Sequence, residues 1–201
     1  MMMNSGGNPM SGSPNLMMYA GWGSQVLTGG DGIDTVVFPG MHSDFMIDRT
    51  AQGCTVTGLT VSIDDTLVGI ERLKFSDMKL AFDDAAANTA KLIGAAFGMQ
   101  FIQPALNGTG ISLFDQGNTM QDVAAMALAA MAGADTNEHL VNMLYTNVVG
   151  HAPDAASLMY YVDMLDHGMT RVDMLMLAAN SDANAQHIDL VGIMSHGLQY
   201  L

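Results

Sequence analysis

The residues best suited to chemistry in this sequence are two aspartates set among glycines. Residues 29–37 read GGDGIDTVV, which follows the nonapeptide G-G-x-G-x-D-x-U-x, where U is a large apolar residue. Calcium takes about six to eight oxygen ligands, so carboxylates must be joined by backbone carbonyls that converge only at a tight turn. Asp31 and Asp34 would supply charge and Gly29 the turn, which predicts a Ca²⁺ site. A hairpin turn without metal has the same composition, so that alternative stays open.

Composition sets the size of the fold and excludes some partners. The chain has 201 residues, 49% of them hydrophobic, which is enough for one large or two small domains. Its 20 acidic and 6 basic residues give a net charge of −14. Because such a chain repels nucleic acids and anionic lipids, we expect no nucleic-acid partner. Residues 92–201 contain a single base, Arg171, and this acidity suits an exterior rich in Ca²⁺.

The sequence shows no targeting or membrane-spanning segment. Its first residues, MMMNSGG, lack the charged start and apolar core of a secretory signal peptide. No apolar run approaches about 18 residues, which predicts no membrane span. Cys54 is the only cysteine, so no disulfide forms within one chain, and we expect its thiol to be packed rather than catalytic.

Periodicity divides the chain into three parts. Residues 1–24 are rich in Met, Gly, Ser and Asn, which favours a flexible arm, or alternatively a segment that folds on a neighbouring subunit. Residues 25–82 hold short apolar runs between turn signals, which is typical of β structure. From residue 83 to residue 201 the apolar residues follow a helical period.

Residues 83–201 predict a compact all-α domain of six or seven short helices. Thr119 is a candidate N-cap, residues 135–138, DTNE, indicate the capping-box start of a helix that ends before Gly150, and Pro153 suits the first turn of another helix. Residues 104–110, PALNGTG, contain helix breakers, and one last helix is expected from about residue 182 to residue 197. The predicted fold class is α+β: a short antiparallel or β-roll-like segment followed by the helices.

A second motif follows the glycine-rich turn. Residues 65–77 read DTLVGIERLKFSD. With residues 29–35, they resemble the end of the repeats-in-toxin (RTX) region of bacterial proteins exported by type I secretion, where G-G-D-G-x-D precedes D-T-L-x-G-I-E-R-L-x-F-x-D-G. Met78 stands where that pattern has Gly. The resemblance implies Ca²⁺ binding with Asp64 or Glu71 as further ligands. For Glu71, a salt bridge to a neighbouring base on the sheet is an equal alternative.

The helical half also resembles a known module. Residues 144–156 read LYTNVVGHAPDAA, followed by YYV and LDHG. They are similar to the small helical domain of unassigned function common downstream of RTX repeats, with pattern L-Y-x-N-V-L-G-R-x-P-D-x-x-G-x-x-Y-W and then L-x-x-G. The departures are His151 for Arg, Ser157 for Gly and Tyr161 for Trp. The resemblance implies recognition by a type I secretion machinery through an uncleaved C-terminal signal, and hence a secreted or cell-surface location.

Other features favour a structural protein over an enzyme. The sequence has no H-E-x-x-H, G-x-S-x-G or P-loop motif, so we expect no catalytic site. Of its 20 methionines, 6 lie in residues 1–18. Those in helices suit flexible core packing, whereas an adaptable contact between subunits and Cu(I) ligation are the alternatives.

These features together predict a secreted calcium-binding structural protein. We expect it to self-assemble at the cell surface or in the extracellular matrix, as a surface layer, filament or adhesive coat. Its partner would be itself, as a homo-oligomer or polymer, through the arm and an exposed sheet edge. The alternative is a soluble extracellular adhesion or ligand-binding module.

Overall fold

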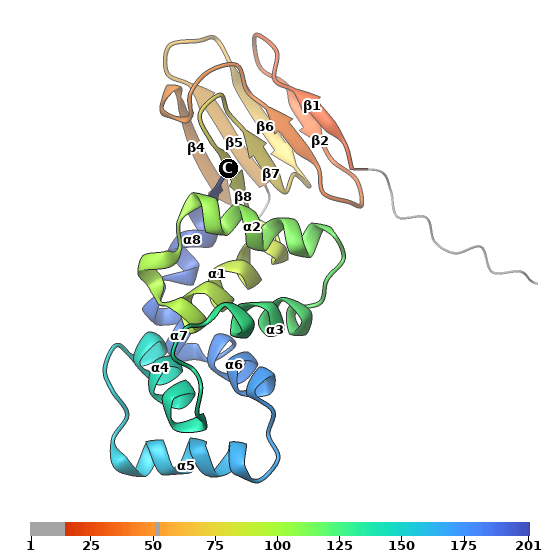
Figure 1. Ribbon diagram of the computed structural model, residues 1–201. Coiled ribbons are helices and arrows are strands. Elements are labelled where there is room, and N and C mark those ends of the chain that lie inside the picture. Colours follow the sequence, from red (N-terminus) through yellow and green to blue (C-terminus); the bar gives the residue numbers. More distant parts are fainter. Residues whose placement is uncertain (1–14, 51–52) are drawn as a thin grey trace, which may run out of the picture. The chain divides into compact units, whose positions relative to one another are not determined.

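The structure, a computed structural model, describes residues 15–50 and 53–201. The chain divides into two compact units, Met1–Asp77 and Met78–Leu201, which we call the β unit and the helical unit and describe separately (Figure 1). The predicted fold class, α+β, is confirmed. Within the described ranges, no helix is long and apolar enough to cross a membrane.

The β unit is a coil that alternates between two sheets. Its elements are β1 (Met17–Tyr19), β2 (Val26–Thr28), β3 (Thr35–Val37), η1 (His42–Asp44), β4 (Phe45–Thr50), β5 (Gly53–Gly58), β6 (Asp64–Val68) and β7 (Arg72–Lys74). The first three strands begin nine residues apart, at residues 17, 26 and 35. β1, β3 and β7 are parallel neighbours in one sheet, and β2 pairs in parallel with β6 in the other. One turn of the coil therefore takes 18 residues, as the pairing of Met17 with Thr35 shows.

The core of the β unit is a column of inward side chains. Met18 lies beside Val36, which lies beside Leu73, and in the other sheet Leu27 lies beside Leu67. The antiparallel β4–β5 hairpin extends the second sheet through β6. Three phenylalanines close one part of the core, with ring centroids 5.3–5.5 Å apart: Phe38, Phe45 and Phe75.

One strand lies where a flexible arm was expected. Residues 17–19 form β1, and Gly23 forms an isolated bridge with Ile63. The arm assignment is thus wrong for this part, because the parallel partner β3 supplies order that the local composition does not encode. Residues 1–14 of the expected arm lie outside the described residues.

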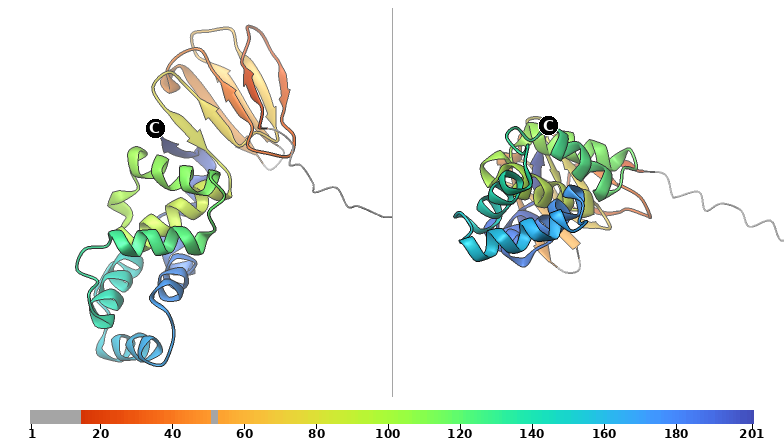
Figure 2. Two further views of the ribbon diagram at one scale, coloured as in Figure 1. Left: turned by 45° about the vertical axis from the view of Figure 1, so that its right-hand side comes forward. Right: turned by 60° about the horizontal axis from the view of Figure 1, so that its bottom comes forward.

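The helical unit places eight α-helices between two short strands. Its elements are β8 (Lys79–Ala81), α1 (Asp84–Phe97), η2 (Met99–Phe101), α2 (Pro104–Asp115), α3 (Met120–Ala130), α4 (Asn137–Val149), α5 (Ala155–Asp166), α6 (Arg171–Ala179), α7 (Asp182–His187), α8 (Leu190–His196) and β9 (Leu198–Tyr200). α1 is central and contacts α2, α3, α4 and α6 (Figures 1 and 2). Its buried face is rich in alanine, which lets the surrounding helices approach closely.

Polar caps define most helix starts. Thr119 accepts a hydrogen bond from the Asp122 N–H, and the Asp122 carboxylate accepts one from the Thr119 N–H, which completes a capping box. Thr136 accepts from the His139 N–H. At the other end of α4, Gly150 takes the left-handed conformation with φ of 87°. The boundaries at Thr119 and Gly150 agree with the sequence because caps are local signals, whereas α4 is capped by Thr136 and not by the capping box predicted at residues 135–138.

The helical unit departs from expectation in three places. α2 runs through Gly108 and Gly110, where a Cβ would lie 2.9 Å from the Leu201 carbonyl oxygen and 2.6 Å from Thr89 Cγ2, so the glycines permit close packing rather than break the helix. Two helices, α7 and α8, replace the single last helix that was expected, because Asp189 turns the chain with φ of 51°. β8, which lies in the range expected to be β structure, pairs antiparallel with β9, and β9 is a strand in the region 83–201 that was expected to be only helical.

Candidate metal site in the β unit

The turn at residues 29–34 links β2 to β3 and requires glycine at its start. A Cβ on Gly29 would overlap the Gly69 carbonyl oxygen and Oδ2 of Asp34. Gly32 has a positive φ of 148°, which side chains rarely adopt. By contrast, Gly30 has open space around its Cα. The glycines of the nonapeptide therefore bring the ends of β2 and β6 together around Asp34.

Asp34 is the centre of this turn and is completely buried. Its Oδ2 accepts a hydrogen bond from the Gly30 N–H at 2.6 Å, and its Oδ1 accepts one from the Leu16 N–H at 2.8 Å. Its main-chain carbonyl accepts from the Glu71 and Arg72 N–H groups. A charged acceptor strengthens such bonds, so Asp34 ties its own turn to the neighbouring strands.

Glu71 makes the same kind of hydrogen bond as Asp34, one strand further along the sheet. Asp34 and Glu71 stand directly before β3 and β7, which are in register. Glu71 Oε2 accepts the N–H of Asp34 at 2.9 Å, just as Asp34 Oδ1 accepts the N–H of Leu16, the residue before β1. We call Asp34 and Glu71 the carboxylate ladder. It places two negative groups side by side at one edge of the coil.

The other two predicted ligands are less favourably placed. Asp31 lies in the same turn, with an exposed side chain. Asp64 is also exposed, and its Oδ1 accepts the Thr57 hydroxyl at 3.1 Å. Because Asp64 begins β6 and Gly69 follows its end, the strand separates Asp64 from the turn at residues 29–34. Gly29, Asp34 and Glu71 thus come together, Asp31 is adjacent to them, and Asp64 is remote.

Asp65 is a buried carboxylate that is not among the ligands predicted from the sequence. It is 1% exposed; its Oδ1 accepts the Gln25 N–H at 3.1 Å, and its Oδ2 is buried without a hydrogen-bond partner in the described residues. Burial raises the pKa of the Asp65 carboxyl group. One sequence pattern could have indicated Asp65: Asp-Thr followed by an apolar residue occurs at both Asp34 and Asp65.

The carboxylate ladder fits part of a calcium shell. Ca²⁺ takes about six to eight oxygens, and Asp34 and Glu71 bring carboxylate oxygens to the glycine turn. Among the described residues, no group of three His, Cys, Asp or Glu side chains is arranged to hold a metal ion. A Ca²⁺ ion here would therefore need the side chain of Asp31 to turn inward and backbone carbonyls of the glycine turn to complete the shell.

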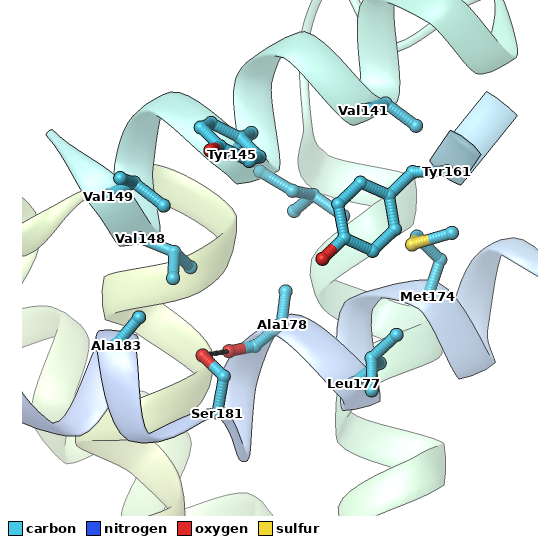
Figure 3. A pocket seen from close by; sticks show the side chains of 11 residues that line it. Val141, Tyr145, Val148, Val149, Tyr161, Met174, Leu177, Ala178, Ser181 and Ala183 are labelled. Atoms are coloured by element: carbon cyan, nitrogen blue, oxygen red, sulfur yellow. Dashed lines mark hydrogen bonds between the residues drawn. The ribbon is translucent and has the colours of Figure 1, made fainter. Parts of the chain in front are cut away.

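The helical unit carries a separate apolar groove. It has about 180 Å³ of space, and no charged side chain lines it. Figure 3 shows Tyr145 and Tyr161 on one side and Leu177 and Ala178 of α6 on the other. The two tyrosine rings are 6.3 Å apart between centroids. This surface can accept an apolar or aromatic group.

Comparisons with known proteins bear only on the helical unit. The model of one family, Domain of unknown function (DUF4214), matches residues 124–188, about a third of the chain. This range runs from α3 to the end of α7 and contains every residue that lines the groove. No curated protein and no solved structure matches the chain.

Proposed function

We propose that this chain is a calcium-binding structural protein that associates with copies of itself outside the cell, in a surface layer, filament or adhesive coat. The observation that carries the proposal is the coil of the β unit. Its first three strands begin nine residues apart, and at the glycine turn Glu71 Oε2 accepts the N–H of Asp34. Such coils bury a continuous core by stacking equivalent turns, so they suit structural roles.

The charge of the chain supports a calcium-rich setting. With a net charge of −14, the protein repels copies of itself until cations screen that charge. A Ca²⁺ ion at the carboxylate ladder would neutralise two buried or half-buried acids and fix the turn. Export by a type I machinery follows from the sequence resemblance and forms part of the proposal.

Isothermal titration calorimetry with Ca²⁺ tests the metal site. Asp31→Asn removes one charge beside the carboxylate ladder without removing a backbone contact of Asp34, so affinity should fall about tenfold or more. Asp64→Asn is the matched control, because its carboxylate is also exposed but lies at the other end of β6. Absence of binding at millimolar Ca²⁺, or equal losses in both variants, would refute the metal site.

Electron microscopy with and without chelator tests assembly. The full chain should form ordered oligomers or polymers in Ca²⁺ and dissociate when the ion is removed. A protein that stays monomeric at high concentration in Ca²⁺ would contradict the structural role.

The groove of the helical unit supports a second candidate, an extracellular adhesion or ligand-binding module. An uncharged groove flanked by two tyrosines suits the apolar face of a sugar or peptide side chain. Binding of the monomer to a glycan array tests it. Tyr161→Ala should abolish a bound signal, whereas Tyr160→Ala should not, because Tyr160 does not line the groove and is 62% exposed. No signal with the unmodified protein would remove this candidate.

A further inference from the structure

The β unit ends in two strands that each have a single strand neighbour in the described residues. Among the strands that the structure describes, β1 pairs only with β3 and β2 pairs only with β6, so each has a second edge without a strand partner there. Figure 1 shows the two strands together at one margin of the β unit. A strand edge with unpaired N–H and C=O groups is a template for adding another strand.

The core column is incomplete at this margin. Val36 and Leu73 are 0% and 1% exposed, whereas Met18, their neighbour in β1, is only half-buried. Leu67 is 1% exposed, whereas its neighbour Leu27 in β2 is half-buried. The interior of the coil therefore lacks one covering layer beside β1 and β2.

Exposed apolar side chains gather on the same two strands, on the turn between them and on the residue before β1. These side chains are between 40% and 75% exposed. They belong to Leu16, Met17, Tyr19, Trp22 and Val26. We call these residues, with β1 and β2, the open edge. Coil and repeat proteins usually close their ends with a polar cap, and sheets usually protect edges with charged residues or proline. Neither β1 nor β2 contains a charged residue or a proline.

The distribution of charge indicates what covers the open edge. Residues 1–30 contain no Asp, Glu, Lys or Arg, so the entire net charge of −14 arises from residue 31 onward. Two copies that meet through their open edges bring uncharged surfaces together, whereas contact through other parts of the chain opposes acid to acid. A basic partner would gain nothing from a neutral surface, so the surface favours another copy of this acidic chain.

The chain's own upstream sequence is a poor continuation of the coil. With 18 residues per turn, the strand that would follow β2 outward spans residues 8–10, which read NPM. Proline at the centre of that strand has no N–H to donate to a neighbour. A strand from a second molecule has no such defect.

We propose that two copies of this chain associate through their open edges, by pairing of the β1 or β2 strands and mutual covering of the apolar side chains around Trp22. This inference rests on the proposed self-association and names the surface that carries it. The contact is self-complementary, because each copy presents the same strands and the same uncharged residues.

Sedimentation velocity of the full chain over a hundredfold concentration range in millimolar Ca²⁺ tests the inference. Met17→Lys and Val26→Lys add a charge at exposed positions of the open edge, and should weaken self-association about tenfold or more. Val191→Lys is the matched control, because Val191 is 83% exposed in the helical unit and its replacement should leave association unchanged. Trp22 is the only tryptophan, so its emission should shift to shorter wavelength as the unmodified protein associates.

The possible outcomes separate this inference from the proposed function. If the unmodified protein assembles and both lysine variants assemble equally well, the open edge is refuted while the structural role stands. If the unmodified protein remains monomeric, both fail. If Trp22 emits at short wavelength in dilute monomer and shifts to longer wavelength when residues 1–14 are deleted, the chain's own arm covers the edge and the inference is wrong.

Discussion

In the β unit, the strands are three to six residues long and are connected by turns that contain glycine. In the helical unit, the helices are six to fourteen residues long and mostly begin at polar caps. The helical unit surrounds α1 with its own helices, so its core closes on itself. The β unit leaves Met18 and Leu27 half-covered at one end. The core of the helical unit is therefore covered by its own helices. The core of the β unit is held by its turns and is left partly uncovered beside β1 and β2.

Two probes can follow the regions separately. The backbone amides of β3, β6 and β7 lie in the β unit, so their hydrogen exchange reports the unfolding of that unit. Far-UV circular dichroism is dominated by the helices and therefore reports the helical unit. Each substitution below should move one probe and leave the other nearly unchanged, if the two units fold independently.

The largest effect is expected from a cavity in the helical core. Leu175 is completely buried in α6, so Leu175→Ala should lower the free energy of unfolding of the helical unit by about 2–5 kcal/mol. Urea denaturation followed by circular dichroism measures it. Leu177→Ala in the same helix is the control. Because Leu177 is 46% exposed, this substitution should lower the free energy of unfolding far less. Equal losses would show that the core is not where the structure places it.

A turn substitution probes the β unit with a smaller effect. Gly29→Ala would force a Cβ against the Gly69 carbonyl and Asp34, and should destabilise the β unit by about 1–3 kcal/mol. Gly30→Ala in the same turn meets no atom within 4 Å and should be nearly neutral. Hydrogen exchange of the backbone amides of the β unit measures both. A neutral Gly29→Ala would mean that the turn tolerates a side chain and does not gather the carboxylate ladder.

Local signals explain what the sequence predicted in each region. Thr119, Thr136 and Gly150 act within one helical turn of their own position, so their roles are readable from neighbouring residues. The β4–β5 hairpin is similarly local, because its two antiparallel strands follow each other directly in the chain. Pairing of β8 with β9 joins residues about 120 positions apart, as Lys79 with Tyr200, and no local pattern indicates it.

The candidate site was only partly readable for a related reason. The motif and the resemblance predicted Gly29, Asp34 and Glu71 as parts of one metal site, and in the structure these three residues lie together. The resemblance selected Asp64 rather than Asp65, although neighbouring residues on a strand face opposite sides. In β6 the alternation puts Asp64 in solvent and Asp65 in the core, and only the register with β2 decides which side is which.

A helix cap should have a smaller effect than either core or turn. Thr119→Ala removes the side-chain oxygen that accepts the Asp122 N–H, and should lower the stability of the helical unit by about 1 kcal/mol. Thr109→Ala is the control, because its hydroxyl only donates to the Ala105 carbonyl within α2. Circular dichroism during thermal or urea unfolding measures both. A Thr119→Ala loss no larger than that of Thr109→Ala would refute the capping box.

The smallest effect is expected from an exposed ion pair at the start of α4. His139 Nδ1 lies 2.6 Å from Asp135 Oδ1, and this hydrogen bond raises the pKa of His139 and lowers that of Asp135. Because the folded pKa of His139 is raised, its small stabilisation is present below the unfolded histidine pKa and is lost as pH rises through the folded value. Proton NMR titration of the imidazole should therefore show a higher pKa in the unmodified protein than in Asp135→Asn. Salt should reduce the difference, since both side chains are exposed to solvent. Hydrogen exchange of the β unit should be unaffected by Asp135→Asn, because the pair belongs to the helical unit. An unchanged His139 pKa in Asp135→Asn would show that the pair does not persist in solution.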